Sequence, residues 1–201
     1  MGKIYPEITP RLREFIAAQH MFFVATAPVG GEGHVNVSPK GIAGTSLVVD
    51  EGTFAYLDII ASGAETIAHL RENGRITVMF CSFETQPKIL RLHGTGKVIR
   101  PDSPEYARWA PRFALAGSIA ARAIIVVEVH RISDSCGFGV PLMDYQGERQ
   151  IFPGHAERKG EEKLRAYQGE KNAVSIDGLP ALDPGGANEV GRTPPASSRA
   201  T

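Results

Sequence analysis

Residues 53–83 read TFAYLDIIASGAETIAHLRENGRITVMFCSF, and this stretch predicts a strand, a helix and a second strand in direct succession. Residues 53–59 and 75–83 are rich in the β-branched, aromatic and other apolar side chains that favour strands. Between them, Ser62 is followed three residues later by Glu65, which is the pattern of a capping box at the start of a helix. The stretch therefore predicts a helix held between two neighbouring strands.

The flanking sequence adds more strand patterns with short connections. Gly94 and Gly96 lie inside the longest of them, residues 88–100, and glycines within a strand indicate a bulge or a close backbone approach. Asn73-Gly74 ends the central helix, because glycine adopts the left-handed conformation at little cost. The remaining strand patterns cover residues 22–27, 34–38, 45–49 and 123–132. Six or seven antiparallel strands with a few helices predict a mainly β, α+β domain shaped as a small barrel.

The composition excludes several classes of protein. Acidic and basic residues number 22 each, and this zero net charge argues against a nucleic-acid binder. No apolar run approaches the ~20 residues of a membrane helix, and the first residues lack the apolar core of a signal peptide. The two cysteines, Cys81 and Cys136, form neither a disulfide framework nor a CxxC motif. We therefore expect a cytoplasmic protein in which both thiols are reduced and buried.

A length of 201 residues predicts one domain. We place this domain at residues 1–182, with a C-terminal extension that begins near residue 133. Residues 183–201 contain a single large apolar side chain, Val190, and cannot bury enough surface to offset their ordering entropy. We expect this tail to be disordered.

The segment HVNVSPKG, residues 34–41, alternates polar and apolar side chains. Asn36, Ser38 and Lys40 share one face of the expected strand. Pro39 cannot donate to a strand ladder, so the strand should end there or lie at the edge of the sheet. A lysine beside a hydroxyl and a glycine suits a phosphate group, although the same pattern is also that of a solvated strand face.

Two further polar groupings are candidate sites. The segment SGAET, residues 62–66, begins the central helix, whose free amides and dipole favour an anion. Ser62 and Thr66 add hydroxyl groups, unless the motif serves only to cap the helix. Arg91 and His93 share a strand face and could flank a planar anion, although Arg91 could equally pair with a surface carboxylate.

Other chemistries lack a supporting pattern. The chain has no P-loop, no GxSxG elbow and no GxGxxG turn. No two of its six histidines stand at metal-ligand spacing, so we predict no metal site. No residue is singled out as a catalytic acid or base.

Three segments together resemble the pyridoxamine 5′-phosphate oxidase-related family of FMN-binding split β-barrel proteins. These segments are VNVSPKG, FAYLD with the later SGAETIAHLRENGRITVMFCSF, and ILRLHGTGKVI. Their order and spacing agree with the family over residues 6–129. The later strings SCGFGVP and SIDGLPAL resemble motifs of one subgroup.

The resemblance implies a six-stranded antiparallel split barrel that forms a homodimer, with FMN bound between the subunits. It implies that Lys40 grips the cofactor and that Ser62, Gly63 and Thr66 hold its phosphate. The full set of implied cofactor-binding residues is Ser38, Lys40, Tyr56, Leu57, Asp58, Ser62, Gly63, Thr66 and Arg91.

Two departures from the family pattern concern the substrate. Ser62-Gly63-Ala64 stands where the authentic oxidase has a basic Ser-Arg-Lys triplet, so two positive charges are missing beside the phosphate. The arginine-rich C-terminal segment that holds the substrate phosphate in the authentic oxidase has no match in this chain. Pyridoxamine phosphate is therefore not the substrate that we expect.

The leading interpretation is an FMN-dependent oxidoreductase that acts on a small molecule, with the flavin supplying the redox chemistry. The alternative is a non-catalytic sensor or carrier of flavin, deazaflavin or haem, because the family also contains deazaflavin and haem proteins. Haem would need an axial ligand, for which His93 and His130 are the candidates. A third hypothesis is an interaction module with an empty site.

Overall fold

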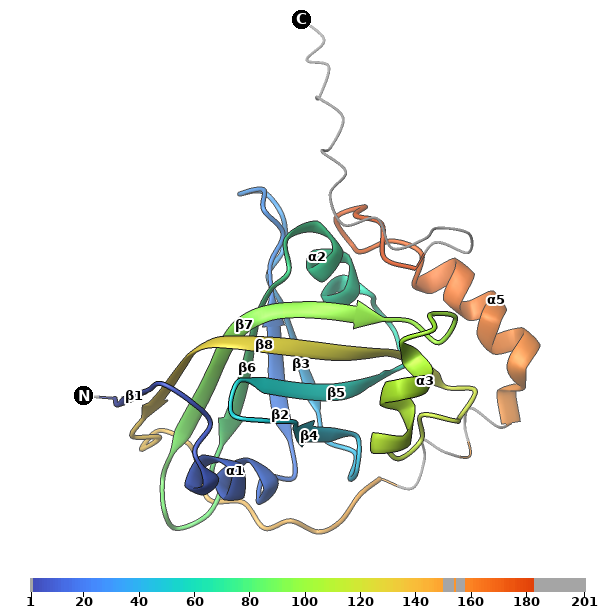
Figure 1. The fold of residues 1–201 in the computed structure, drawn as a ribbon. Helices are drawn as coiled ribbons and strands as arrows, with labels where there is room; N and C mark the ends of the chain where they lie inside the picture. Colours follow the sequence, from blue (N-terminus) through green and yellow to red (C-terminus); the bar gives the residue numbers. More distant parts are fainter. Residues whose placement is uncertain (1, 150–153, 155–157, 183–201) are drawn as a thin grey trace, which may run out of the picture.

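The computed structural model describes residues 2–149, 154 and 158–182, and it consists mainly of one strongly curved antiparallel sheet (Figure 1). The sheet confirms the predicted antiparallel barrel with flanking helices. Its eight strands run in the order β3-β2-β6-β7-β8-β5-β4, with β1 paired to β8. The strands are β1 (Ile4–Tyr5), β2 (Phe22–Thr26), β3 (Asn36–Lys40), β4 (Ser46–Val48), β5 (Thr53–Ile59), β6 (Arg75–Cys81), β7 (Ile89–Ile99) and β8 (Ala121–Ser135).

The strand count exceeds the expected six because β1 and β4, of two and three residues, are short additions at the margins of the sheet. Strands β3 and β4 lie at the two ends of the strand order and do not pair with each other, which leaves the barrel split between them. Pro39 lies within β3, and this confirms the prediction of an edge position for that strand. The expected disordered tail, residues 183–201, lies outside the described residues.

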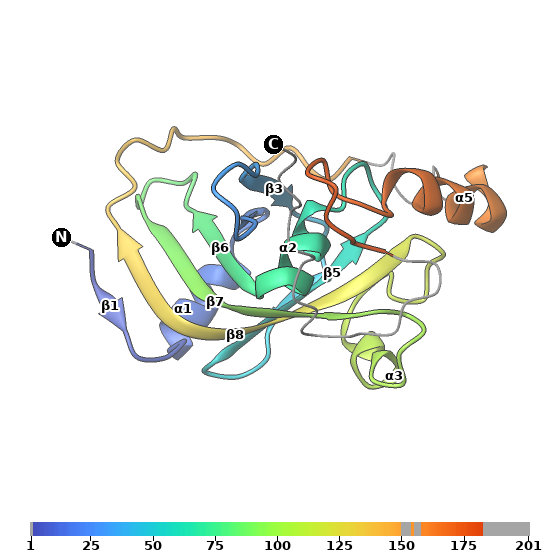
Figure 2. The same ribbon diagram turned by 90° about the horizontal axis from the view of Figure 1, so that it is seen from above.

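Four α-helices flank or fill the sheet. Thr9 caps the first of them by accepting a hydrogen bond from the backbone N–H of Leu12 at 3.3 Å, with Pro10 at the first helical position. Figure 2 shows α2 within the curve formed by β6, β7, β8 and β5. The helices are α1 (Pro10–Ala17), α2 (Glu65–Asn73), α3 (Tyr106–Trp109) and α5 (Glu161–Lys171), and the short 3₁₀ helix η1 (Ala110–Arg112) follows α3.

The interior of the barrel is aromatic. Phe22, Phe54, Tyr56 and Phe80 are buried there, and the rings of Phe22 and Phe54 meet edge to face at a centroid distance of 5.5 Å. Side chains of α2 close this core from one end. A second cluster lies on the outer side of β5 and β8, where Ala55, Leu57 and Ile124 pack against Tyr106 and Phe113.

The start of α2 differs from the sequence prediction. Ala64 is its N-cap and no side chain caps the helix, so the predicted capping box between Ser62 and Glu65 is wrong. Ser62 lies two residues before the N-cap, too early to reach the first-turn amides, and Glu65 instead accepts a hydrogen bond from the backbone N–H of Ile176. Gly74, with φ 72°, ends the helix as predicted.

The cysteines occupy different environments. Cys81 is buried, and burial raises the pKa of its thiol. Cys136 is exposed because it directly follows the end of β8, so the expectation that both thiols are buried is wrong for Cys136.

The C-terminal extension returns to the barrel after a long excursion across its surface (Figure 1). Leu164 of α5 is buried against Ile60 and Ala120, and Ala181 and Leu182 join the barrel core. Among the described residues, no helix is long and apolar enough to cross a membrane.

Gly94 lies at a bulge, as its place within a strand predicted. The pairing of β7 with β8 shifts register between His93 and Gly94, and a methyl group on Gly94 would lie 2.1 Å from the carbonyl oxygen of Glu128. We expect Gly94→Ala to lower the free energy of unfolding by about 1–3 kcal/mol, because the backbone of β8 must move. Urea denaturation tests this, with Gly117→Ala as the control, since nothing lies within 4 Å of that position. Equal stability of the two variants would contradict the prediction.

Candidate functional site

A buried carboxylate lies at the split in the barrel. Asp58, near the end of β5, is fully buried. Its Oδ1 accepts a hydrogen bond from Nζ of Lys40 on β3 at 3.1 Å, and its Oδ2 accepts one from Nε of Arg122 on β8 at 2.6 Å. One carboxylate therefore connects three strands, including the two sides of the split.

The charges of this cluster are fixed by one another. Burial by itself would raise the pKa of Asp58, but the positive charges of Arg122 and Lys40 outweigh it and hold the pKa below its ordinary value. Asp58 is therefore ionised at neutral pH, and the three side chains carry a net charge of about +1. Lys40 keeps 23% of its side chain exposed, so this positive charge reaches the surface of the site.

A second group of polar side chains joins β3 to α2. Nδ2 of Asn36 donates to Oγ1 of Thr66 at 3.0 Å and to Oγ1 of Thr26 at 3.2 Å. Oδ1 of Asn36 accepts a hydrogen bond from Oγ of Ser38 at 3.1 Å. Because Thr66 accepts from Asn36, its hydroxyl proton is left free to donate elsewhere.

His69 of α2 ends this network. The side chain is fully buried, and burial lowers the pKa of its imidazole, so the ring is neutral at neutral pH. Thr26 accepts from Asn36 and so donates its own proton to Nδ1 of His69 at 2.9 Å, which places the ring hydrogen on Nε2. Nε2 is buried and has no hydrogen-bond partner.

The loop between β5 and α2 lies next to both groups. Gly63 has a φ of 79°, a left-handed conformation that glycine adopts without strain, and its carbonyl oxygen accepts a hydrogen bond from Nη1 of Arg122 at 2.7 Å. Ser62 is exposed. Since α2 has no side-chain cap, its first backbone amides remain available to an anion.

Most of the predicted site residues are connected by these contacts. Ser38 and Thr66 share Asn36, whereas Lys40, Asp58 and Gly63 are linked through Arg122. Arg91 lies apart. It is aligned through Met79 and Phe23 with Pro39, so it shares the sheet face of Pro39, opposite to the face of Lys40, and it donates to Oγ of Ser135 at 3.1 Å.

Two other predicted residues have their side chains in cores. Tyr56 packs in the aromatic interior, and its hydroxyl group is buried without a partner. Leu57 packs on the opposite side of β5, against α3. Neither side chain reaches the groups around Lys40, and both residues flank or precede Asp58 in the strand that positions it.

Sequence reasoning missed Arg122, the residue that links Asp58 to the loop. One signal for it was present, because Arg122 interrupts the apolar run of residues 120–129 near the start of a buried strand. A charged residue in such a position is rarely buried without a partner. What the pattern did not reveal was the identity of that partner, 64 residues earlier in the chain.

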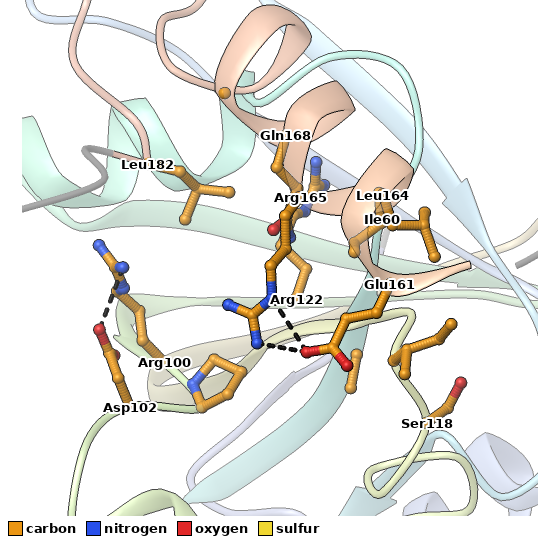
Figure 3. Close-up of a pocket in the computed structure, with 14 residues that line it drawn as sticks. Ile60, Arg100, Asp102, Ser118, Arg122, Glu161, Leu164, Arg165, Gln168 and Leu182 are labelled. Carbon is orange, nitrogen blue, oxygen red and sulfur yellow. Dashed lines mark hydrogen bonds and ion pairs between the residues drawn. The ribbon is translucent and has the colours of Figure 1, made fainter. Parts of the chain in front are cut away.

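A cavity of about 650 Å³ lies on the other side of Arg122, between α5 and the ends of β7 and β8 (Figure 3). Arg165 and Glu161 of α5 pair at 2.6 Å on one side of it, and Arg100 and Asp102 pair at 3.1 Å on another. The buried guanidinium of Arg122 therefore separates this cavity from the loop at Gly63.

Comparisons with known proteins agree with the sequence. The family model described as pyridoxamine 5′-phosphate oxidase matches residues 8–136. A pyridoxamine 5′-phosphate oxidase family protein of Aspergillus flavus, ustO, is 41% identical over 198 residues, which cover 90% of this chain and 78% of that protein. Because only a tenth of the chain is left out, this similarity extends well beyond the range of the family model.

Solved structures of similar shape include a FAD-binding protein of Mesorhizobium loti and HutZ, a haem storage protein of Vibrio cholerae. The first is 12% identical, with a TM-score of 0.47, and the match covers 67% of this chain and 95% of that one. The second is 19% identical, with a TM-score of 0.43, and the match covers 61% and 89% of the two chains.

Asp58→Asn should lower the free energy of unfolding by about 3–5 kcal/mol at neutral pH, because it leaves the charges of Lys40 and Arg122 without their buried partner. The pKa of Asp58 is lowered in the folded protein, so its stabilisation is complete above the unfolded value of 3.8 and is lost as pH falls through the folded value. Urea denaturation from about pH 7 down to about pH 2.5 measures this. The stability difference between wild type and variant should shrink below pH 3.8. A constant difference throughout would show that ionised Asp58 is not its source.

Proposed function

The chain belongs to the pyridoxamine 5′-phosphate oxidase family, and from this we propose that it binds FMN and acts as a flavin-dependent oxidoreductase on a small molecule. The observation that supports the proposal most directly is the position of the Lys40–Asp58–Arg122 cluster. Its surplus positive charge lies next to the loop at Gly63, which leads into the uncapped start of α2. A cation and free helix amides together suit a phosphate group.

The side chains present fit this cofactor at its phosphate end. Lys40 offers a partly exposed ammonium group, and the hydroxyl of Thr66 has a free proton because Asn36 already donates to its oxygen. Both are hydrogen-bond donors, as a phosphate requires. The fit does not depend on the basic triplet of the authentic oxidase, which this chain lacks.

Bound FMN would supply the hydride chemistry, and the protein would supply orientation and electrostatic support. Lys40 would neutralise phosphate charge, and Asp58 would hold the lysine in place. Thr66 would donate a hydrogen bond to a phosphate oxygen. Arg122 would keep the loop at Gly63 against the barrel. No side chain is assigned as a catalytic acid or base.

We propose a substrate other than pyridoxamine phosphate. Recognition of a second phosphate group would need further unpaired cations near the cofactor, and the two arginines beside the neighbouring cavity, Arg100 and Arg165, are already engaged with Asp102 and Glu161. The haem alternative has less support, since Nδ1 of His93 and Nε2 of His130 are both hydrogen-bonded to threonines of the sheet.

Identification of the bound small molecule tests the proposed function. The purified protein is denatured, and the released compound is identified by absorbance and mass spectrometry. FMN, followed by turnover of the reconstituted protein with NADPH and an electron acceptor, is the expected result. A Soret band, a deazaflavin, or FMN bound without any turnover would each overturn the proposed activity.

Lys40→Ala should weaken FMN binding roughly ten- to hundredfold, because it removes one charge-assisted contact to the phosphate. Asp58 keeps Arg122 as its partner in this variant, so the fold should survive. Titration of the apoprotein with FMN, monitored by flavin fluorescence, measures the effect, and a thermal melt confirms folding. Unchanged affinity in a folded variant would reject the role of Lys40.

We further propose that the protein is a homodimer in which the partner subunit completes the flavin site. Val35 and Val37 on the outer side of β3 are 70% and 60% exposed, and the segment after β8 exposes three more large apolar side chains. These three are Phe138, Leu142 and Met143. Exposed apolar groups of this size and number are typical of an interface.

Val37→Asp should shift the protein toward monomer and weaken flavin binding, because it places a charge within the proposed interface. Ala107→Asp, on the exposed side of α3, is the matched control and should remain dimeric. Light scattering over a dilution series, with and without FMN, gives both oligomeric states. A wild-type monomer that binds FMN tightly would contradict the shared site.

A further inference from the structure

Residues 172–182 of the C-terminal extension run past α2 and contact it at both ends; we call them the strap. At one end, the backbone N–H of Ile176 donates to Oε1 of Glu65 at 3.3 Å. Farther along, the carbonyl oxygen of Ala181 accepts a hydrogen bond from Arg71. The strap thus lies beside the same helix that would receive the flavin phosphate.

The first residue of the strap reaches the loop before α2. Asn172 is fully buried, and its Nδ2 donates to the carbonyl oxygens of Ala61 at 3.0 Å and of Gly63 at 3.2 Å. Gly63 also receives the hydrogen bond from Arg122. Two loop carbonyls are therefore turned toward the extension and β8.

The geometry of the peptide bond gives these contacts a consequence. In a trans peptide, the C=O of one residue and the N–H of the next point in opposite directions, and the described chain has no cis peptide bond. When Asn172 holds the carbonyls of Ala61 and Gly63, the N–H groups of Ser62 and Ala64 must point away from it. Neither amide has a hydrogen-bond partner among the residues that the structure describes. Successive free amides of this kind form an anion-binding concavity.

An unsatisfied atom supports the same reading. With Nδ2 facing the two carbonyls, Oδ1 of Asn172 is buried without any hydrogen-bond partner. A buried acceptor without a donor lowers stability, and such atoms call for an explanation beyond packing. Here the orientation that leaves Oδ1 unpaired is the one that fixes the loop.

We propose that Asn172 is a positioning residue for the phosphate of the flavin: it orients the peptides of the β5–α2 loop so that the amides of Ser62 and Ala64 face the phosphate. This inference rests on the proposed function. It assigns part of the cofactor site to a segment beyond residue 136, where the match to the family model ends. The strap therefore acts on the site through the loop and not by contact with the cofactor.

Riboflavin, which lacks the phosphate, separates this role from a general structural one. Asn172→Ala should weaken FMN binding roughly five- to tenfold and leave riboflavin affinity unchanged. Asn172→Asp, which keeps the volume but removes the donors, should weaken FMN binding at least as much. The matched control is Asn73→Ala, which removes a similar hydrogen bond from an asparagine to a carbonyl, that of Ala27 at 2.9 Å, at the other end of α2. This control should reduce thermal stability without changing the preference for FMN over riboflavin.

A second measurement does not require a flavin. Inorganic phosphate is titrated into ¹⁵N-labelled protein, and the amide signals of Ser62 and Ala64 are followed. They should shift in wild type and in Asn73→Ala, but not in Asn172→Ala. This response in a protein that binds no FMN would overturn the proposed function and leave the role of Asn172 standing. An unchanged FMN-to-riboflavin ratio in Asn172→Ala, or equal phosphate shifts in both asparagine variants, would overturn the role of Asn172.

Discussion

The ionised carboxylate of Asp58 is the constraint on which the candidate site depends. It lies buried where the barrel is split, and it can stay charged there only because Lys40 and Arg122 both reach it. A buried ion pair adds little net stability once desolvation is counted, but removal of one partner is costly. The three strands are therefore held in one arrangement, because any shift that separates Asp58 from either cation leaves a buried charge unpaired. The same arginine then fixes the loop at Gly63.

Local patterns in the sequence predicted much of the fold. The strands, the ends of α1, the edge position of β3 and the bulge at Gly94 all follow from signals within a few residues. The predicted capping box failed for a non-local reason, since Glu65 bonds to Ile176, 111 residues away. The alternation in β7 placed Arg91 and His93 on one face correctly, but a strand pattern does not say which face of a curved sheet meets the site. That choice depends on how four strands align.

The C-terminal extension was the hardest part to interpret from sequence. Its contacts are made by single polar groups at irregular intervals, such as Asn172 with Gly63 and Asp177 with His34. Such contacts have no period, and each joins residues more than a hundred positions apart in the chain. The burial of Ala181 and Leu182 in the barrel core shows that this segment is part of the domain. Its composition alone gave no indication of this.

If the protein binds a flavin phosphate, the loss of the basic triplet changes how that binding works. Two side-chain charges are absent at Gly63 and Ala64, and the cluster at Asp58 returns a net charge of only about +1. The remaining attraction must come from backbone amides. Amides hold a phosphate only when their peptides are correctly oriented, whereas a flexible lysine or arginine adjusts to its ligand. A site of this kind needs a rigid loop, and Arg122 and Asn172 provide that rigidity from opposite directions in the chain. The extension therefore compensates for charges that the loop itself does not have.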